Sequence, residues 1–235
     1  MVLLNDAVTG VVVTYNSKDL IKTAYESVRN FHPEMKIIIV DGSNKNDSCY
    51  AYVKSLESHY TFPFQVEYNI GHGRGMCAGL YYVDTPYVLF FDSDIRMLKS
   101  PIISMINMFE KDTFGVGYIE KTGFDGYEFG VHPQHKQEGW VPYLHPYFQL
   151  VSVDNYYKFH PYIHHGAPCI FTMVDIYKKG LSDKILKEFN GLGHSSGKGF
   201  TWTGMPREYI QHDVAGTRKI NKIQKNIEIE GVWER

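Results

Sequence analysis

The run YVLFFDSDI restricts the possible folds of this chain more than any other segment. Five apolar or aromatic residues, Tyr87 to Phe91, precede Asp92, Ser93 and Asp94. A continuous apolar run of this length predicts a buried strand of a parallel sheet, with both carboxylates at its carboxyl end, where open α/β sheets bind ligands. Two such carboxylates can hold one divalent cation that bridges a diphosphate, although a simple Asp/Ser turn gives the same pattern.

Two further strands are predicted upstream, at Val11–Thr14 and in the segment KIIIVDGS, which ends its apolar run at Asp41. A helix is expected between these two strands, with Asn16 and Ser17 as its caps. Its apolar residues recur every four positions. A glycine-rich turn, NIGHGRGMCAGL from Asn69, leads into another helix before the strand that carries Asp92. Strands that alternate with helices predict an α/β fold with a doubly wound parallel sheet.

The order of the motifs TYN, DGS, NIGHGRG and FFDSD resembles the nucleotide-sugar-binding half of a family 2 glycosyltransferase of the GT-A fold. The resemblance covers about Val11 to Gly115. It implies a Rossmann-like, mostly parallel central sheet flanked by helices, with a loop-rich second half on the acceptor side. It also implies a nucleotide-diphosphate sugar as donor and a saccharide or other hydroxyl compound as acceptor.

The same resemblance assigns residues to the donor site. Asp41 is expected to contact the nucleobase, Asp92 the ribose or the metal, and Asp94 a Mn²⁺ or Mg²⁺ ion on the sugar diphosphate. Arg74 is expected to add a diphosphate contact. The full set predicted to bind the nucleotide sugar is Thr14, Tyr15, Asn16, Asp41, Asn69, Gly71, Arg74, Asp92 and Ser93.

The composition agrees with one enzyme domain. The 235 residues are 43% hydrophobic, which is enough for a sizeable core, and the formal net charge of −2 argues against nucleic-acid binding. No apolar stretch reaches the length of a membrane helix, and the start of the chain lacks a signal sequence, so a cytoplasmic protein is expected. We predict a single domain over 1–235, with a nucleotide-sugar-binding half (1–115), an acceptor-binding half (116–218) and a tail (219–235).

The second half is less regular. We expect a helix from Ser100 and Pro101 to about Glu110, a strand from Phe114, a long loop from Lys121 to Tyr143 over the acceptor side, and a strand HPYFQLVSV. A short helix is expected to begin at Asp154. The segment from Gly191 to Gly204 is predicted to be a flexible lid or connector, in which Trp202 is able to close over substrate.

The catalytic base is the least certain part of the prediction. Many inverting family 2 enzymes carry an acidic pair at the start of the acceptor-side helix, whereas this chain has Ala167 and Pro168 there. His164 or His165 could act as the base, because imidazole has suitable basicity and the pair precedes this helix.

Three carboxylates are the alternatives to the histidine pair. Asp175 lies about two turns into the helix, while Asp154 and Glu138 lie on the loop side.

His212, in QHDVAGTR, resembles the histidine that many GT-A enzymes use as a further metal ligand. It is followed in that segment by Gly216 and Thr217, although a partly exposed histidine at a strand end is equally compatible with the pattern. The resemblance therefore implies a metal-dependent glycosyltransferase that inverts the anomeric centre. The alternatives are a catalytically silent nucleotide-sugar-binding domain, or a nucleotidyltransferase, although the glycine-rich loop typical of the latter is absent after the first strand.

Overall fold

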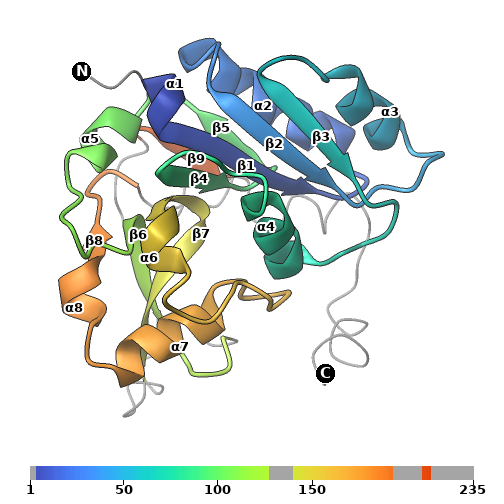
Figure 1. The fold of residues 1–235 in the computed structure, drawn as a ribbon. Helices are drawn as coiled ribbons and strands as arrows, with labels where there is room; N and C mark the ends of the chain where they lie inside the picture. The colour runs from blue at the N-terminus through green and yellow to red at the C-terminus, as the bar shows by residue number, and fades with distance from the viewer. Residues whose placement is uncertain (1–3, 127–139, 193–207, 213–235) are drawn as a thin grey trace.

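A computed structural model describes residues 4–126, 140–192 and 208–212 (Figure 1). Its main element is a seven-stranded sheet with the order β3-β2-β1-β4-β7-β6-β8, beside a two-stranded ribbon of β5 and β9. The strands are β1 (Val8–Thr14), β2 (Lys36–Asp41), β3 (Thr61–Gln65), β4 (Tyr87–Phe91), β5 (Ile95–Met97), β6 (Gly115–Thr122), β7 (Val141–Ser152), β8 (Leu186–Glu188) and β9 (Ile210–His212).

Helices cover both faces of this sheet. They are α1 (Leu4–Ala7), α2 (Lys18–Phe31), α3 (Ser48–Ser55), α4 (His72–Leu80), α5 (Ile102–Ile106), α6 (Val153–Tyr156), α7 (Ile170–Lys178) and α8 (Ser182–Ile185). Helices α2, α3 and α5 contribute to one apolar core, and α4 and α7 to the other. No helix among the described residues is long and apolar enough to cross a membrane.

Strands β3, β2, β1 and β4 are parallel, as the apolar runs predict. Successive residues of these strands face opposite cores: Ile37 and Ile39 pack on the α2 side, Ile38 and Val40 on the α4 side. Burial on both faces explains why each strand is a continuous apolar run.

The other half of the sheet is antiparallel. Strand β7 runs antiparallel to both β4 and β6. The predicted loop from Lys121 to Tyr143 is therefore too long, because β6 continues to Thr122 and β7 already begins at Val141.

Three predicted helix limits are wrong. Helix α5 ends at Ile106 rather than near Glu110, because the Met108 and Phe109 N–H groups donate to carbonyls only three residues back and form tighter turns. Helix α6 begins one residue before Asp154, with the Ser152 hydroxyl as its cap. Helix α7 begins at Ile170, two residues after Pro168.

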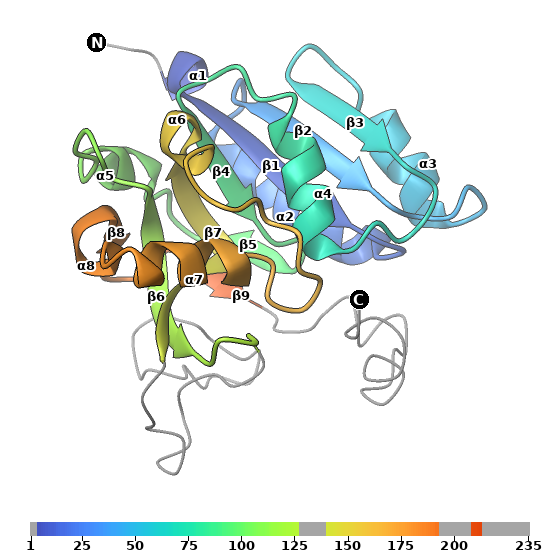
Figure 2. The same ribbon diagram turned by 60° about the horizontal axis from the view of Figure 1, so that its bottom comes forward.

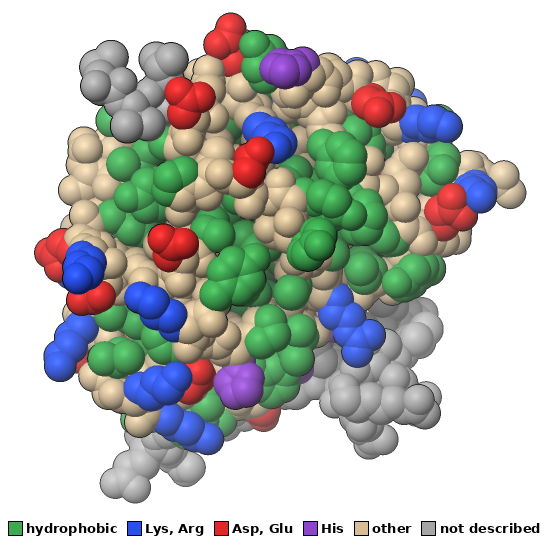
Figure 3. Space-filling view, viewed as in Figure 1, with side chains coloured by type: hydrophobic (Ala, Val, Ile, Leu, Met, Phe, Trp, Pro, Cys, Tyr) green, Lys and Arg blue, Asp and Glu red, His purple; other side chains and the backbone are tan. Residues whose placement is uncertain are grey.

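The edge strand β3 and the carboxyl end of α4 expose aromatic side chains. Tyr82 packs against Phe62 and Phe64, with ring centroids 5.2 Å apart in both pairs. Figure 3 shows hydrophobic side chains gathered over this part of the molecule. Pro63 lies within β3 and cannot donate a ladder hydrogen bond, which suits an edge strand.

Candidate active site

The predicted site residues meet at the carboxyl ends of three neighbouring strands. Thr14 and Asp41 are paired at the ends of β1 and β2, and Asp92 follows the last residue of β4. The parallel register places these ends at one edge of the sheet, where ligands bind in such folds. The apolar runs therefore located this edge correctly.

Asp92, Asp94 and His212 form a cluster whose ligand atoms all lie within 4.8 Å of one another. His212 Nε2 is 3.1 Å from Asp94 Oδ1 and 3.5 Å from Asp92 Oδ2. The ribbon explains the meeting, because β9 pairs with β5 in a register that sets His212 opposite Ile95, the residue after Asp94. Gly216 and Thr217, predicted to follow His212, lie outside the described residues.

The cluster is electrostatically coupled. Burial opposes a charge on His212. The hydrogen bonds that its ring donates to Asp92 and Asp94, together with the negative charges of these two residues, outweigh this effect and raise the pKa of His212 to about 9. Burial likewise opposes the charge on Asp92, yet His72 and His212 hold the pKa of its carboxyl well below the usual range. Without a metal, an imidazolium thus balances the two carboxylates.

His72 is a site residue that the sequence analysis missed. Its Nε2 lies 3.2 Å from Asp92 Oδ1, whereas His212 contacts the other oxygen of the same carboxylate, Oδ2. His72 is the first residue of α4, within the glycine-rich motif NIGHGRG. A histidine at a helix start beside a strand end was an available signal, but its partner lies 20 positions further along the chain.

Tyr147 of β7 contacts two members of the cluster. Its ring stacks on the His212 ring with centroids 4.9 Å apart and an interplanar angle of 9°. Its carbonyl oxygen accepts the Asp92 N–H at 2.9 Å. One residue of the antiparallel half of the sheet therefore orients both the histidine and one of the carboxylates.

The loops after β1 and β2 are held together by hydrogen bonds. Asn16, with φ of 45°, donates its N–H to Ser43 Oγ at 2.8 Å, and its side-chain oxygen accepts the Asn44 N–H at 3.2 Å. Asparagine tolerates this left-handed backbone better than most residues. Ser17 precedes α2 as predicted, but its hydroxyl pairs with Thr14 Oγ1 instead of capping the helix.

Asp41 is fully buried. Its Oδ1 accepts the Ser43 N–H at 2.9 Å and its Oδ2 accepts from Gln65 Nε2 at 3.3 Å. These contacts hold the turn after β2 against β3. Gln65 is a second residue at this edge that the sequence analysis did not include.

The start of α4 contacts the loop that carries the histidine pair. The His72 N–H donates to His165 Nδ1 at 3.3 Å, and the Gly73 N–H donates to the His164 carbonyl at 3.1 Å. Gly73 has no room for a side chain, since a Cβ would lie 2.4 Å from that carbonyl oxygen. The predicted residues of this turn are thereby placed beside the pair: Asn69, Gly71 and the exposed Arg74.

The histidine pair and Asp175, which were predicted as possible bases, have different surroundings in the structure. Both histidines accept a backbone N–H at Nδ1, His164 from Ala167 and His165 from His72, so the neutral rings carry their proton on Nε2. Burial also lowers the pKa of His164. Asp175 forms an ion pair at 3.1 Å with Lys179, the residue that follows α7.

Asp154 is too far from the cluster to act as the base. It follows Ser152, which pairs with Tyr87 at the amino end of β4, whereas Asp92 follows the carboxyl end. Five residues of strand separate these ends by about 17 Å. Glu138 and Trp202 lie outside the described residues.

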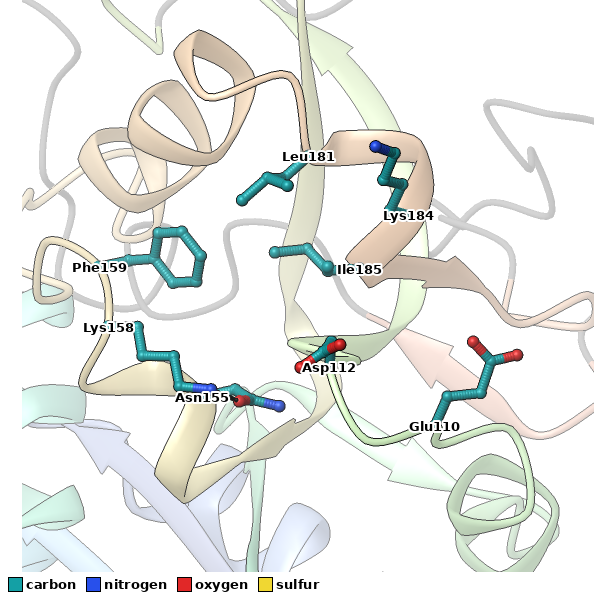
Figure 4. A pocket seen from close by; sticks show the side chains of 8 residues that line it. All are labelled: Glu110, Asp112, Asn155, Lys158, Phe159, Leu181, Lys184 and Ile185. Carbon is teal, nitrogen blue, oxygen red and sulfur yellow. Dashed lines mark hydrogen bonds between the residues drawn. The ribbon is translucent and has the colours of Figure 1, made fainter.

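A pocket of about 350 Å³ lies away from this cluster (Figure 4). It is close to the amino end of β6, where the Thr113 carbonyl accepts from Asn155. None of the predicted site residues lines it; the lining residues are Glu110, Asp112, Asn155, Lys158, Phe159, Leu181, Lys184 and Ile185.

Comparisons with known proteins identify a family and a shared fold. A sequence model of the family described as glycosyl transferase family 2 matches residues 9–177. A search of curated proteins found no match.

Solved structures share the fold at low identity. S. aureus TarS, residues 1–349, is 18% identical with a TM-score of 0.53, covering 78% of this chain and 58% of that one. The same fragment in complex with UDP-GlcNAc is 17% identical with a TM-score of 0.53, covering 78% and 56%. The mannosyltransferase PcManGT from Pyrobaculum calidifontis, in complex with GDP-Man and Mn²⁺, is 12% identical with a TM-score of 0.56, covering 77% and 54%. The chain thus spans little more than half the length of these proteins.

Proposed function

Because this chain belongs to glycosyl transferase family 2 and has its GT-A fold, we propose that it moves a sugar from a nucleotide-diphosphate sugar to a hydroxyl acceptor, with inversion and with the help of a divalent metal. The resemblance drawn from the four motifs is confirmed by the family match. That match also favours a glycosyltransferase over the nucleotidyltransferase alternative.

The observation that carries the proposal is the cluster of Asp92, Asp94 and His212 at the carboxyl end of β4. Two carboxylates and one imidazole that converge from two strands fit a divalent cation. The imidazole favours Mn²⁺ over Mg²⁺, which prefers oxygen ligands. A bound cation would neutralise charge that develops on the nucleoside diphosphate as it leaves.

The remaining predicted residues take roles that their positions support. Thr14, Tyr15, Asn16 and Asp41 surround the ends of β1 and β2, where we propose that the nucleoside binds. Asn69, Gly71 and Arg74 flank the start of α4, where a helix amino terminus and a guanidinium suit a diphosphate. His72 is proposed to hold Asp92 in position.

A silent binding domain is the second candidate. It is favoured by the segment just before α7, where the buried Ala167 and Pro168 stand in place of an acidic pair. A domain without a base would bind the donor and not transfer the sugar.

Ligand-induced stabilisation tests the donor site. Thermal unfolding is followed with UDP, GDP, UDP-sugars and GDP-sugars, each with and without Mn²⁺. A ligand at 100 times its dissociation constant adds about 2.7 kcal/mol, which corresponds to roughly 5–10 °C for a domain of this size. We expect such a shift only with Mn²⁺ and a nucleotide together.

Asp94→Ala should abolish this shift. The control Asp154→Ala, close to the amino end of β4, should retain it. An equal shift in both variants would contradict the assignment of the metal site.

A further inference from the structure

Residues 163–168, here called the capping segment, lie across the start of α4. Figure 2 shows the chain between α6 and α7 passing beside this end of the helix. The first N–H groups of a helix have no partner within it. Here the His72 N–H donates to His165 Nδ1 at 3.3 Å and the Gly73 N–H donates to the His164 carbonyl at 3.1 Å. The capping segment therefore takes the place of a side-chain cap, which Gly71 at the N-cap position cannot supply.

Two glycines allow this close contact. A Cβ at Gly71 would lie 3.2 Å from His165 Nδ1, and a Cβ at Gly73 would lie 2.8 Å from the His164 backbone nitrogen. Gly71 also has a φ of 81°, which residues with a side chain rarely adopt. The turn before α4 is thus shaped to receive the capping segment.

One buried amide holds both ends of the capping segment. Gln149 of β7 accepts a hydrogen bond from the Tyr162 hydroxyl at Oε1, at 3.2 Å, and its Nε2 donates to Cys169 Sγ at 3.3 Å. Tyr162 directly precedes the segment and Cys169 directly follows it. All three side chains are fully buried. The six residues between these two anchors are therefore fixed to the sheet at both ends.

The position of Gln149 in the sheet is otherwise apolar. Gln149 pairs with Phe90 of β4, and the Phe90 ring packs against Tyr162 with centroids 5.5 Å apart. A buried amide costs free energy unless its polar groups are hydrogen-bonded. A satisfied buried polar group fixes one arrangement of the elements that it joins. Gln149 thus specifies where the capping segment lies, which an apolar residue at this position could not do.

The capping segment reaches the metal cluster through His72. The backbone of His72 is held by His165, and its ring nitrogen Nε2 lies 3.2 Å from Asp92 Oδ1. A shift of the segment would move the start of α4, and with it the ring that contacts Asp92. A continuous series of contacts therefore joins Gln149, in the core, to a carboxylate of the cluster.

We propose that Gln149 is a positioning residue for the metal cluster, which acts by holding the capping segment against the start of α4. This inference rests on the proposed function. Partners that orient a metal ligand from behind commonly change metal affinity by 10- to 100-fold when they are replaced. In this role His165 contributes to the donor side of the site, as the acceptor that fixes His72.

The test compares Gln149→Met with Asn155→Leu in the full chain. Each change replaces a buried amide with an apolar side chain of similar size. Asn155 donates to the Thr113 carbonyl at 2.8 Å, close to the amino end of β6 and away from the cluster. Both variants should unfold at a lower temperature than the wild type, so binding is measured at a temperature at which circular dichroism shows all the chains folded.

The informative measurement is the Mn²⁺ requirement. Mn²⁺ is titrated at a fixed concentration of UDP or GDP, and bound nucleotide is measured by equilibrium dialysis. We expect the Mn²⁺ concentration for half-maximal binding to rise by about tenfold in Gln149→Met and to stay at the wild-type value in Asn155→Leu. Transfer from UDP- and GDP-sugars to a panel of methyl and p-nitrophenyl glycosides should fall in Gln149→Met at limiting Mn²⁺ and recover at saturating Mn²⁺.

Tyr162→Phe provides a second variant that removes only one of the two anchoring hydrogen bonds. It should also raise the Mn²⁺ requirement, by less than Gln149→Met does. The double variant should be no worse than Gln149→Met alone, because both changes break the same connection. If Gln149→Met does not fold, Tyr162→Phe carries the test against Asn155→Leu.

Two results would overturn the inference and leave the proposed function intact. One is an unchanged Mn²⁺ requirement in the folded variants of Gln149 and Tyr162. The other is an equal rise in Asn155→Leu, which would make the effect one of general destabilisation. A wild-type chain that neither binds a nucleotide with Mn²⁺ nor transfers any sugar would instead overturn the proposed function, and the role of Gln149 with it.

Discussion

His212 Nε2 lies 3.1 Å from Asp94 Oδ1, although 118 positions separate the two residues in the chain. The contact depends on the pairing of two three-residue strands, β5 and β9. Strands this short gain little stability from their own ladder. The site is therefore complete only when a late segment of the chain docks beside the strand that follows the two aspartates.

Removal of His212 should destabilise the metal-free protein. In His212→Gln, Asp92 and Asp94 stay close together without the imidazolium that balances them, and both side chains are largely buried. We expect the free energy of unfolding at pH 7 in EDTA to fall by about 3–5 kcal/mol, as for other broken buried pairs. Urea denaturation measures it. A variant as stable as the wild type would show that the three side chains are not electrostatically coupled.

Asp41 should contribute both to stability and to nucleotide binding. In Asp41→Ala the Ser43 N–H and the Gln65 amide lose an acceptor at a fully buried position, which should cost about 1–3 kcal/mol. Nucleotide affinity, measured by calorimetry, should also fall. Asp47→Ala, which removes the cap of α3, should lower stability by about 1 kcal/mol and leave the affinity unchanged. Normal nucleotide affinity in Asp41→Ala would show that Asp41 only stabilises the turn after β2.

Helix α4 should depend on glycine where it crosses β1. A Cβ at Gly79 would lie 2.5 Å from Val11 Cγ1 and 3.0 Å from Val40 Cγ2. Gly79→Ala should therefore lower the free energy of unfolding by about 1–3 kcal/mol, because both valines are buried. Ala78→Ser on the neighbouring, half-buried position serves as the control. Equal stability of the two variants in urea would indicate that α4 shifts at little cost.

His72 should act on donor binding through Asp92. His72→Gln removes the 3.2 Å contact between His72 Nε2 and Asp92 Oδ1 and lets the Asp92 carboxylate rotate. We expect binding of Mn²⁺ with a nucleoside diphosphate to weaken by about tenfold, in line with the loss of a group that orients a metal ligand. His59→Gln, beside the exposed Tyr60 before β3, is the matched control. Affinity that is unchanged by His72→Gln would remove His72 from the site.

Glu120 should make the stability depend on pH. Burial raises the pKa of this β6 carboxyl to about 7 in the folded state against an ordinary value of 4.5, so its favourable contribution is complete below pH 4.5 and is lost as the pH rises through 7. Glu120→Gln lacks this loss. Its free energy of unfolding should therefore increase relative to that of the wild type as the pH rises from 4.5 to 7. At pH 8 the variant should be more stable by about 1–2 kcal/mol, a difference that is kept small because the side chain is partly exposed. A constant difference in unfolding free energy across this range would contradict the raised pKa.

Local patterns predicted the parallel half of the fold. The ends of β1, β2 and β4 at Thr14, Asp41 and Phe91 follow from apolar runs that stop at polar residues. The antiparallel half was harder to predict. Strand β7, Val141–Ser152, contains two prolines and shows no clear alternation of apolar and polar residues. Its order comes from pairing with β4 and β6, which no local pattern reveals.

The same limit applies to the site. Asp92 and Asp94 were visible as a motif, and His212 was found only through the family resemblance, since β9 is too short to have a pattern of its own. His72 was missed because its significance depends on a residue distant in the sequence, the carboxylate of Asp92.

Release of nucleoside diphosphate from a sugar donor tests the proposed glycosyl transfer most directly. The wild-type chain is incubated with UDP- and GDP-sugars, Mn²⁺ and the glycoside acceptors, and released UDP or GDP is quantified together with the glycoside product. We predict equimolar release and product with at least one donor, loss of both in EDTA, recovery with Mn²⁺, and loss of both in Asp94→Ala. Release that is unaffected by EDTA and by Asp94→Ala, or no release from any donor, would contradict the account.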